Sequence, residues 1–302
     1  NRMSNVLTLK SGELVFPAAS LVVVMDPQTA QQRFFRGHTA EVTNIAVHAA
    51  SGVVASAQTG RHSSVMVWTP IFGRQEISST EVLSVIQLPN KGGARALDIS
   101  SCGELLLCVG ADSYHTLSIW NWRNKECLIK QKNSNQPVFG MRFNPYLCVP
   151  ISKAAQPEHA TYTLVSCGVR HMKFWTMLQE KDEPWEGAAT TWKLECTAAS
   201  SGRSSDHFDV NCICFVEDNP GDVGIGAPPS GRIYSGTAAG DIYVWTQLEE
   251  QFSDEDMDEL YDHNQGGGAP RIRWQSRGKY LGSVRAHDGP IYDMKTLVDG
   301  EN

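Results

Sequence analysis

The sequence alternates short apolar runs with polar turns, and one phrase of three runs recurs along it. The clearest copy lies between Gly37 and Trp68, with apolar runs at 42–48, 53–58 and 64–69. Each run has the length at which β-strands are most common. The phrase opens with the dipeptide Gly-His and closes with tryptophan. This pattern predicts three consecutive strands, and a fourth apolar segment follows at about 81–88.

The same phrase returns three more times, and each copy ends at a tryptophan. The closing residues are Trp68, Trp120, Trp175 and Trp245, which are 52, 55 and 70 residues apart. A self-similar unit of this size with four strands is the sequence signature of a β-propeller blade. The sequence therefore predicts an all-β chain folded as a propeller.

We assign about five blades and the first strand of a sixth. The predicted blades span residues 5–38, 39–90, 91–134, 135–199 and 205–287, and the next blade starts within 288–302. Propellers typically have four to eight blades, so this count predicts an incomplete ring. We favour further blades from the same, longer chain. Blades from another chain, or a five-bladed closure that leaves 291–299 unexplained, are the alternatives.

The connections between predicted strands differ in length on the two faces of the disc. If the strands of a blade are named a to d in chain order, every b–c connection is short. The long insertions fall on a–b or c–d connections, at 145–162, 217–231 and 248–277 among others. We therefore expect one compact face and one loop-decorated face. Insertions on one face often mark the binding face, although loops also lengthen where nothing constrains them.

A set of polar and aromatic residues resembles the blade signature of WD repeats. In that signature a histidine before the blade hydrogen-bonds into it, together with a hydroxyl on strand b and the indole N–H, since a buried indole needs a partner. We interpret these residues as structural and not catalytic. The predicted signature residues are His38, Trp68, Trp120, Trp175, His207, Ser235, Asp241, Trp245 and His287.

The net charge of −7 comes from one segment. Residues 249–262 hold eight of the 33 acidic side chains and no basic one, so the other residues, with 25 acidic and 26 basic side chains, carry +1. A global argument about an acidic protein therefore fails, and we expect 249–262 to be a solvated loop. The basic residues are scattered, with one cluster at Arg271, Arg273, Arg277 and Lys279.

The eight cysteines form no Cys-x-x-Cys pair and sit mostly in apolar runs. We interpret them as reduced, buried thiols of an intracellular protein, with a disulfide framework as the alternative. No apolar window is long enough to span a membrane, and the first residues show no signal peptide. The first residue is Asn and not Met, so we expect a piece of a longer chain.

No motif predicts a catalytic, cofactor-binding or metal-binding residue. Residues 254–258 begin like a calcium loop, but Glu259 stands where glycine is needed and Gln265 where glutamate is needed. The glycine-rich segment 221–226 precedes Ala-Pro-Pro and no helix, so it has no helix N-terminus for a phosphate. Nucleophile-elbow, zinc-protease and Walker motifs are absent from the sequence.

Several phrases together resemble the tandem-propeller region of the echinoderm microtubule-associated protein-like family. The double-tryptophan phrase Leu-Ser-Ile-Trp-Asn-Trp lies at 117–122. The other matching phrases, in the same order as in the family, are at 34–39, 45–48, 137–140, 166–168, 174–176 and 286–289. The similarity covers nearly the whole chain. The family's upstream hydrophobic segment and coiled coil are absent or only touched.

The resemblance implies a non-enzymatic microtubule-associated scaffold. We expect it to bind tubulin, or microtubule and axonemal proteins, through the loop-decorated face, with basic side chains meeting the acidic tubulin surface. A cytoplasmic, cytoskeletal location follows, and a cilium or axoneme is plausible. The alternative is a general WD-repeat adaptor without tubulin contact, which predicts a peptide-sized groove on the compact face. An enzyme would need carboxylates around a deep central pocket. Nucleic acid and membrane are not expected partners.

Overall fold

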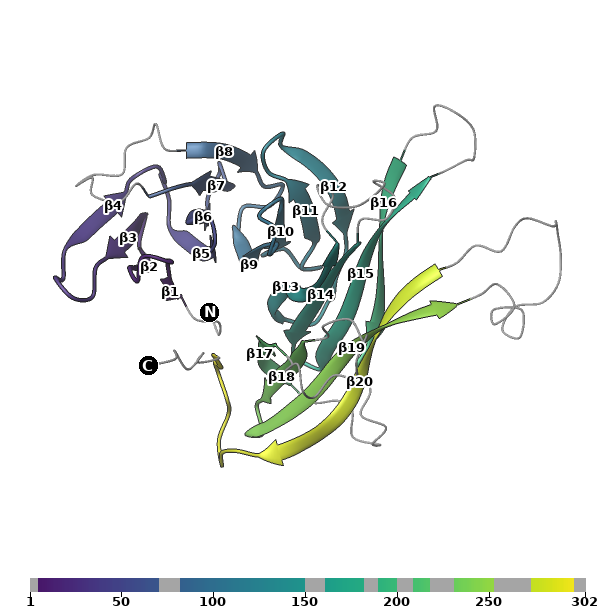
Figure 1. The fold of residues 1–302 in the computed structure, drawn as a ribbon. Coiled ribbons are helices and arrows are strands. Elements are labelled where there is room, and N and C mark those ends of the chain that lie inside the picture. The colour runs from purple at the N-terminus through teal and green to yellow at the C-terminus, as the bar shows by residue number, and fades with distance from the viewer. Residues whose placement is uncertain are drawn as a thin grey trace.

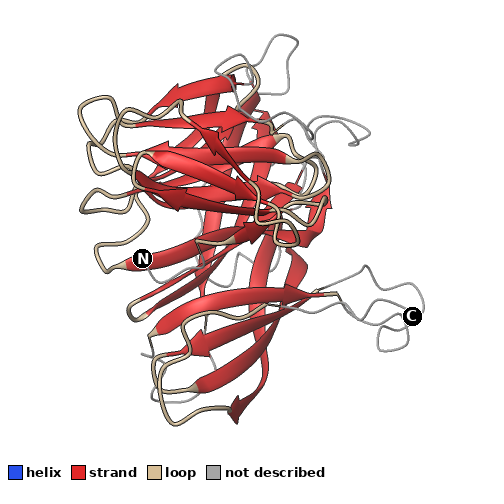
Figure 2. Cartoon of the chain, turned by 90° about the vertical axis from the view of Figure 1, so that its left-hand side faces the viewer, coloured by secondary structure: helices blue, strands red, loops and turns tan. Residues whose placement is uncertain are grey.

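The chain folds into strands and loops arranged around a common centre. The computed structural model describes residues 5–70, 82–149, 161–181, 190–199, 209–217, 231–252 and 273–295. In these ranges the strands form five four-stranded antiparallel sheets, each with its strands in chain order. Figure 1 shows the sheets following one another from purple to yellow, and Figure 2 shows the strands from the side. The predicted all-β propeller with an unclosed ring is confirmed.

The strands are numbered in chain order, and sheets one to five each take four of them. Sheets one and two contain β1 (Leu7–Thr8), β2 (Leu14–Ala18), β3 (Leu21–Met25), β4 (Gln32–Phe35), β5 (Val42–His48), β6 (Val53–Gln58), β7 (Ser64–Trp68) and β8 (Val82–Gln87). Sheet three contains β9 (Ala94–Ile99), β10 (Leu105–Gly110), β11 (Leu117–Asn121) and β12 (Glu126–Gln131). Sheets four and five contain β13 (Val138–Val149), β14 (Thr161–Gly168), β15 (His171–Lys181), β16 (Thr190–Ala198), β17 (Val210–Val216), β18 (Arg232–Thr237), β19 (Asp241–Phe252) and β20 (Arg273–Arg285).

Each of sheets two to five has an equivalent backbone hydrogen bond outside its strand ladders. The N–H of the residue after the second strand donates to the carbonyl of the residue before the first strand. The four bonds are Thr59 to Glu41 (2.9 Å), Ala111 to Gly93 (3.1 Å), Val169 to Pro137 (2.8 Å) and Ala238 to Asp209 (2.9 Å). Because the same two chain positions meet in each sheet, residues of different sheets can be compared position by position.

The four repeat tryptophans occupy the same place in the strand register. Each lies on the third strand opposite an aliphatic residue of the second strand. The pairs are Trp68 with Val54, Trp120 with Leu106, Trp175 with Leu164, and Trp245 with Ile233. The repeat seen in the sequence is therefore a repeat in space.

The core lies between consecutive sheets. Phe35 at the end of sheet one stacks on Trp68 of sheet two, with ring centroids 4.3 Å apart and planes 5° apart. Phe174 of sheet four packs against Trp245 of sheet five at 6.0 Å. One buried apolar cluster spans each of the four junctions. The repeat tryptophan of a sheet thus packs toward the sheet before it, as Trp68 and Trp245 illustrate.

Several strands of sheets four and five are longer than the apolar runs predicted. β13 reaches Val149, and the β19–β20 ladder continues to the pair Phe252 and Arg273. The predicted insertions at 145–162 and 248–277 therefore shorten to 150–160 and 253–272, and residues 249–252 of the acidic window are strand. Backbone hydrogen bonds pair these strand extensions, so the sequence showed no apolar alternation there.

The end of the described chain contacts the last sheet without forming a strand. We expected a strand at 291–297, but residues 286–295 carry none. Ile291 is nevertheless buried, its N–H donates to Thr237 O at 3.0 Å and its carbonyl accepts from Asn211 Nδ2 at 3.1 Å. An inner strand forms its ladder with the second strand of its own sheet, and the described ranges contain no such strand. Lys295 Nζ also donates to Val6 O at 3.1 Å, joining the last described segment to the first.

Candidate functional site

The signature of sheet two is a chain of three side-chain hydrogen bonds. His38 lies in the loop before β5, Ser56 on β6 and Trp68 on β7. Trp68 Nε1 donates to Ser56 Oγ at 2.9 Å, and Ser56 Oγ lies 2.6 Å from His38 Nε2. His38 Nδ1 lies 3.0 Å from Gln58 Oε1. All four residues are buried, so the chain satisfies polar atoms that water does not reach.

The direction of these bonds fixes the proton on His38. Gln58 Oε1 is an acceptor, since it also takes the backbone N–H of Thr39 at 3.0 Å. His38 therefore donates from Nδ1–H, and its bare Nε2 accepts the Ser56 hydroxyl proton. Burial lowers the pKa of His38, against a smaller upward effect of the Gln58 hydrogen bond. A neutral imidazole with both nitrogens engaged holds the blade together and is not available as an acid or base.

Sheet four builds the same chain from a different histidine. Trp175 Nε1 donates to Ser166 Oγ at 2.8 Å, and Ser166 Oγ lies 2.7 Å from His171 Nε2. His171 is the first residue of β15, so it enters from the turn after strand b and not from the loop before the sheet. Burial lowers the pKa of His171 to about 4, and nearby Lys173 and His115 act in the same direction. The sequence analysis did not select His171.

Sheet five retains the hydroxyl and the indole. Trp245 Nε1 donates to Ser235 Oγ at 2.9 Å. The predicted His207 lies outside the described residues. Asp241 donates its backbone N–H to Thr237 Oγ1 at 3.0 Å, and its carboxylate faces Arg285 at 3.5 Å. The Asp241 carboxylate therefore links the first residue of β19 to the last residue of β20.

His287 lies in the exposed segment that follows β20. Its backbone N–H, like that of Ala286, donates to Gly240 O, at 3.1 and 3.0 Å. Gly240 has φ +95, and a Cβ there would lie 2.1 Å from His287 O. The segment thus rests on the β18–β19 turn through backbone contacts, with the imidazole outside them.

Sheet three keeps the tryptophan and changes everything around it. Trp120 Nε1 donates to Ser118 Oγ of its own strand at 2.9 Å. The position of Ser56, two residues after the aliphatic residue opposite the tryptophan, is Cys108 in sheet three. The position of Gln58, opposite the first residue of strand a, is Gly110.

At two more positions around Trp120, a side chain without a ring stands where a ring stands near Trp68. Four residues before strand a, where sheet two has His38, sheet three has Asn90. Three residues earlier, where sheet one supplies Phe35, sheet two supplies Gln87. The indole of Trp120 is half-buried, whereas those of the other three repeat tryptophans are at most 1% exposed.

The loss of these two rings does not by itself expose an indole, because sheet four has Gln131 and Ser134 at the same positions and Trp175 is still buried. Trp120 differs also in its bond to its own strand and in the neighbouring Cys108 and Gly110.

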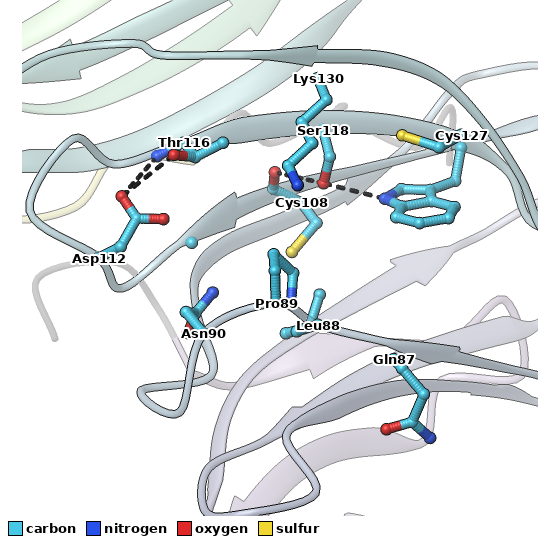
Figure 3. A pocket seen from close by; sticks show the side chains of 12 residues that line it. Gln87, Leu88, Pro89, Asn90, Cys108, Asp112, Thr116, Ser118, Cys127 and Lys130 are labelled. Carbon is cyan, nitrogen blue, oxygen red and sulfur yellow. Dashed lines mark hydrogen bonds between the residues drawn. The ribbon is translucent and has the colours of Figure 1, made fainter.

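The result is a cavity of about 350 Å³ between sheets two and three (Figure 3). Its residues come from the end of β8, the loop to β9, and strands β10 to β12. The lining residues are Gln87, Leu88, Pro89, Asn90, Cys108, Gly110, Asp112, Thr116, Ser118, Trp120, Cys127 and Lys130. Ligand pockets in proteins begin at about this size, so this cavity is the candidate binding site of the described part.

The cavity contains little reactive chemistry. Burial raises the pKa of the Cys108 thiol to about 12, so this group is a neutral thiol at physiological pH and a poor nucleophile. Asp112 Oδ1 already accepts Tyr114 N, Thr116 N and Thr116 Oγ1, at 3.0, 3.0 and 3.2 Å. Asn90 Oδ1 is buried and has no hydrogen-bond partner among the described residues. The site is suited to binding through shape and one acceptor.

Other predicted features are placed as follows. Seven cysteines, all except Cys148, are described as free thiols. Among the described residues, no three His, Cys, Asp or Glu side chains gather in a way that could hold a metal ion. In the same ranges no helix has the length and apolar character to cross a membrane. The segment 221–226 and the residues 253–272, which hold most of the acidic window, lie outside the described ranges.

The loop-decorated face is only partly described. The connections β7–β8, β13–β14, β15–β16, β17–β18 and β19–β20 are all of the a–b or c–d kind, and each contains residues outside the described ranges. The b–c connections are described throughout, and none exceeds the six residues of 111–116. By strand order these five connections start and end on the side opposite the b–c turns, whereas the 11-residue connection 199–209 between β16 and β17 is a d–a connection on the b–c side.

Comparison with known proteins adds a family. A family model described as echinoderm microtubule-associated protein first β-propeller matches residues 31–264, more than half of the chain. The chain is 24% identical to mouse echinoderm microtubule-associated protein-like 2 over 98% of its length and 36% of the relative's. It is 25% identical to mouse echinoderm microtubule-associated protein-like 4 and to the human like 1 protein, over 98% of its length and 25% and 29% of theirs.

The chain spans between a quarter and about a third of the length of these relatives. At 25% identity over nearly the whole chain, the resemblance noted in the sequence is confirmed. The family match begins four residues before the end of sheet one and ends beyond β19. The chain therefore belongs to the family of echinoderm microtubule-associated protein first β-propellers.

Proposed function

We propose that this protein is a non-enzymatic scaffold that associates with microtubules. The observation that carries the proposal is the family match over residues 31–264, whose members named above are microtubule-associated proteins. The signature histidines support it, because burial keeps His38 and His171 neutral, His38 has hydrogen bonds at both ring nitrogens, and His171 Nε2 is bonded to Ser166. A cytoplasmic, cytoskeletal location follows from this proposal, and axonemal microtubules belong among the lattices to test.

We assign the contact to the loop-decorated face. Two exposed lysines with no hydrogen bond to described residues lie there: Lys10 in the β1–β2 connection and Lys125 in the β11–β12 turn. On the other face, Arg61 in the β6–β7 turn and Lys91 before β9 are equally exposed. The two pairs carry the same charge, so they allow the faces to be compared with matched variants.

The test is microtubule co-sedimentation across a salt series. Contacts between exposed charges weaken as the Debye length shrinks, from roughly 10 Å at 0.1 M salt to 3 Å at 1 M. The bound fraction should therefore fall smoothly with salt. Lys10→Glu with Lys125→Glu should lower binding more than Arg61→Glu with Lys91→Glu, although both change the net charge by the same amount.

Two results would overturn parts of this proposal. Failure of the wild-type chain to pellet at any salt concentration would remove direct microtubule binding. A larger loss from the Arg61 and Lys91 variant would move the contact to the compact face.

The adaptor alternative has one observation in its favour. The cavity beside Trp120 lies near the compact face, because the loop before β9 and the β10–β11 turn contribute to it. A pull-down that recovers a peptide partner without tubulin would favour an adaptor, and the co-sedimentation experiment separates the two functions.

A further inference from the structure

Sheet two shows one way in which the space around a repeat tryptophan is filled. Phe35 stacks face to face on Trp68, and His38 meets Phe35 edge-on, with centroids 5.6 Å apart and planes at 81°. Phe35 is the last residue of β4 in the preceding sheet, and His38 lies in the loop that follows it. Together with Gln58 they leave Trp68 fully buried.

Sheet three has the same indole and lacks both rings. Gln87 and Asn90 stand at the positions of Phe35 and His38, and Gly110 stands at that of Gln58. A Cβ on Gly110 would lie 2.8 Å from Asn90 Nδ2 and 2.8 Å from Asp112 Oδ2. The side chains of Asn90 and Asp112 therefore occupy the place beside Gly110, and the cavity is lined by both of them and by Trp120.

The polar groups of the cavity narrow the ligand class. Asn90 Oδ1 is a buried acceptor without a described partner, which leaves its desolvation uncompensated in the empty site. The Asp112 Oδ1 atom is already used by its own turn. Lys130 is exposed and its side chain runs beside Ser118 into the cavity in Figure 3, so a cationic ligand meets a like charge there. A neutral group with one donor fits best.

We propose that this cavity binds an aromatic side chain of a partner polypeptide whose ring carries an O–H or N–H donor. The ring replaces Phe35 by stacking on Trp120, and its donor bonds to Asn90 Oδ1. A tyrosine or a neutral histidine side chain has this chemistry. Stacking of the two rings adds a favourable contact beyond the burial of apolar area. The site is separate from the microtubule contact proposed above, and either can fail without the other.

The experiment titrates the whole chain with side-chain analogues and follows indole N–H signals by NMR. The Trp120 signal is the one missing from the Trp120→Phe spectrum. The probes are p-cresol and 4-methylimidazole at pH 8, toluene as a ring without a donor, and methylguanidinium as a cation without an aromatic ring. We expect saturable shifts of the Trp120 signal with the first two, weaker binding of toluene, and no saturation with methylguanidinium.

A filled variant supplies the decisive control. Asn90→His with Gly110→Gln restores the residues that sheet two has, and p-cresol binding should be lost while the other indole signals stay in place. Asn124→His with Gly282→Gln makes the same two exchanges at exposed or open positions, and it should bind p-cresol like the wild type.

Three outcomes overturn the proposal. The first is the absence of a saturable Trp120 shift with either donor-bearing ring. The second is p-cresol binding that survives in the filled variant when that variant retains the wild-type indole spectrum. The third is toluene binding as tight as p-cresol, which would remove the role of Asn90. If the filled variant fails to fold, Asn90→Ala provides the same test, since it should weaken p-cresol and leave toluene unchanged.

Discussion

Sheets two and three have the same strand register around their tryptophans, but the side chains around the two indoles differ. Trp68 is covered by Phe35 and bonded through Ser56 to His38. Trp120 holds the equivalent position opposite Leu106, yet it bonds to Ser118 of its own strand and borders a cavity. The difference teaches that the strand register places the tryptophan. The hydrogen-bond chain from histidine through serine to the indole decides only whether the space around the tryptophan is filled. A blade can therefore lose its signature without losing its fold.

The largest effect should come from removing the two indoles. Trp68→Ala deletes a fully buried side chain, which costs about 3–5 kcal/mol in a core. Trp120→Ala removes a half-buried side chain that already borders a cavity, so it should cost roughly half as much. Urea denaturation of both variants measures the difference in unfolding free energy. Equal losses would show that the two indoles are equally packed.

His171, the histidine of the hydrogen-bond chain in sheet four, should make the unfolding free energy depend on pH. The pKa of His171 is about 4 in the folded chain and about 6.5 unfolded. Below pH 6.5 the unfolded state takes up a proton that the folded state refuses, so the unfolding free energy falls as the pH falls to about 4. The loss should reach about 3 kcal/mol.

This pH effect is measured as the difference between the wild type and His171→Gln. The subtraction is needed because burial raises the pKa of Asp98 to about 6, and a raised carboxyl pKa adds stability as the pH falls from about 6 to 3.8. If the difference between wild type and variant is the same at pH 7 and pH 4.5, His171 does not titrate as a buried group.

The hydroxyls that accept the indole protons should differ in importance. Ser56→Ala leaves the Trp68 N–H and His38 Nε2 without a partner in a buried site, which costs about 1–3 kcal/mol. Ser118→Ala removes the acceptor of the Trp120 N–H and the longer, 3.4 Å bond to Cys108 O, beside a cavity that water can enter, so the cost should be below about 1 kcal/mol. Thermal or urea unfolding of both variants provides the comparison, and a larger loss for Ser118→Ala would contradict it.

The smallest effect should be a gain at Gly110. A Cβ there would lie 2.8 Å from Asn90 Nδ2, 2.8 Å from Asp112 Oδ2 and 3.4 Å from the backbone Thr116 O, so the two side-chain ends must shift toward the cavity to admit it. Replacing glycine by alanine restricts the unfolded chain and should stabilise the protein by about 0.4–1 kcal/mol. Urea unfolding measures it. A loss beyond about 1 kcal/mol would mean that no free space surrounds this position.

The architecture was predictable because its signal is repeated. Four tryptophans at the ends of apolar runs were enough to find sheets two to five, and the structure places all four in one register. The strand ends were less predictable, as β19 shows: Glu249, Glu250 and Gln251 were read as part of an acidic loop, but they pair with β20. Ile291 was predicted to begin a strand, but within the described chain it has no second strand to pair with.

The cavity was not predicted, although its signal is in the sequence. Cys108 was interpreted as one of the buried thiols, and the sequence analysis selected neither Asn90 nor Gly110. Only when the repeats are superimposed through the register do these three fall on Ser56, His38 and Gln58. His171 was missed for a related reason. It reaches its serine from the turn after strand b, and a search for Gly-His before each blade cannot find it there.

The most direct test of this comparison is hydrogen exchange at the indole nitrogens. Trp68, Trp175 and Trp245 donate to serine hydroxyls at buried sites, whereas Trp120 donates beside an open cavity. Protection follows the free energy of the opening that exposes a proton. NMR should therefore find one repeat indole, that of Trp120, exchanging at least about tenfold faster than the other three. Exchange of all four at the same rate would contradict the account.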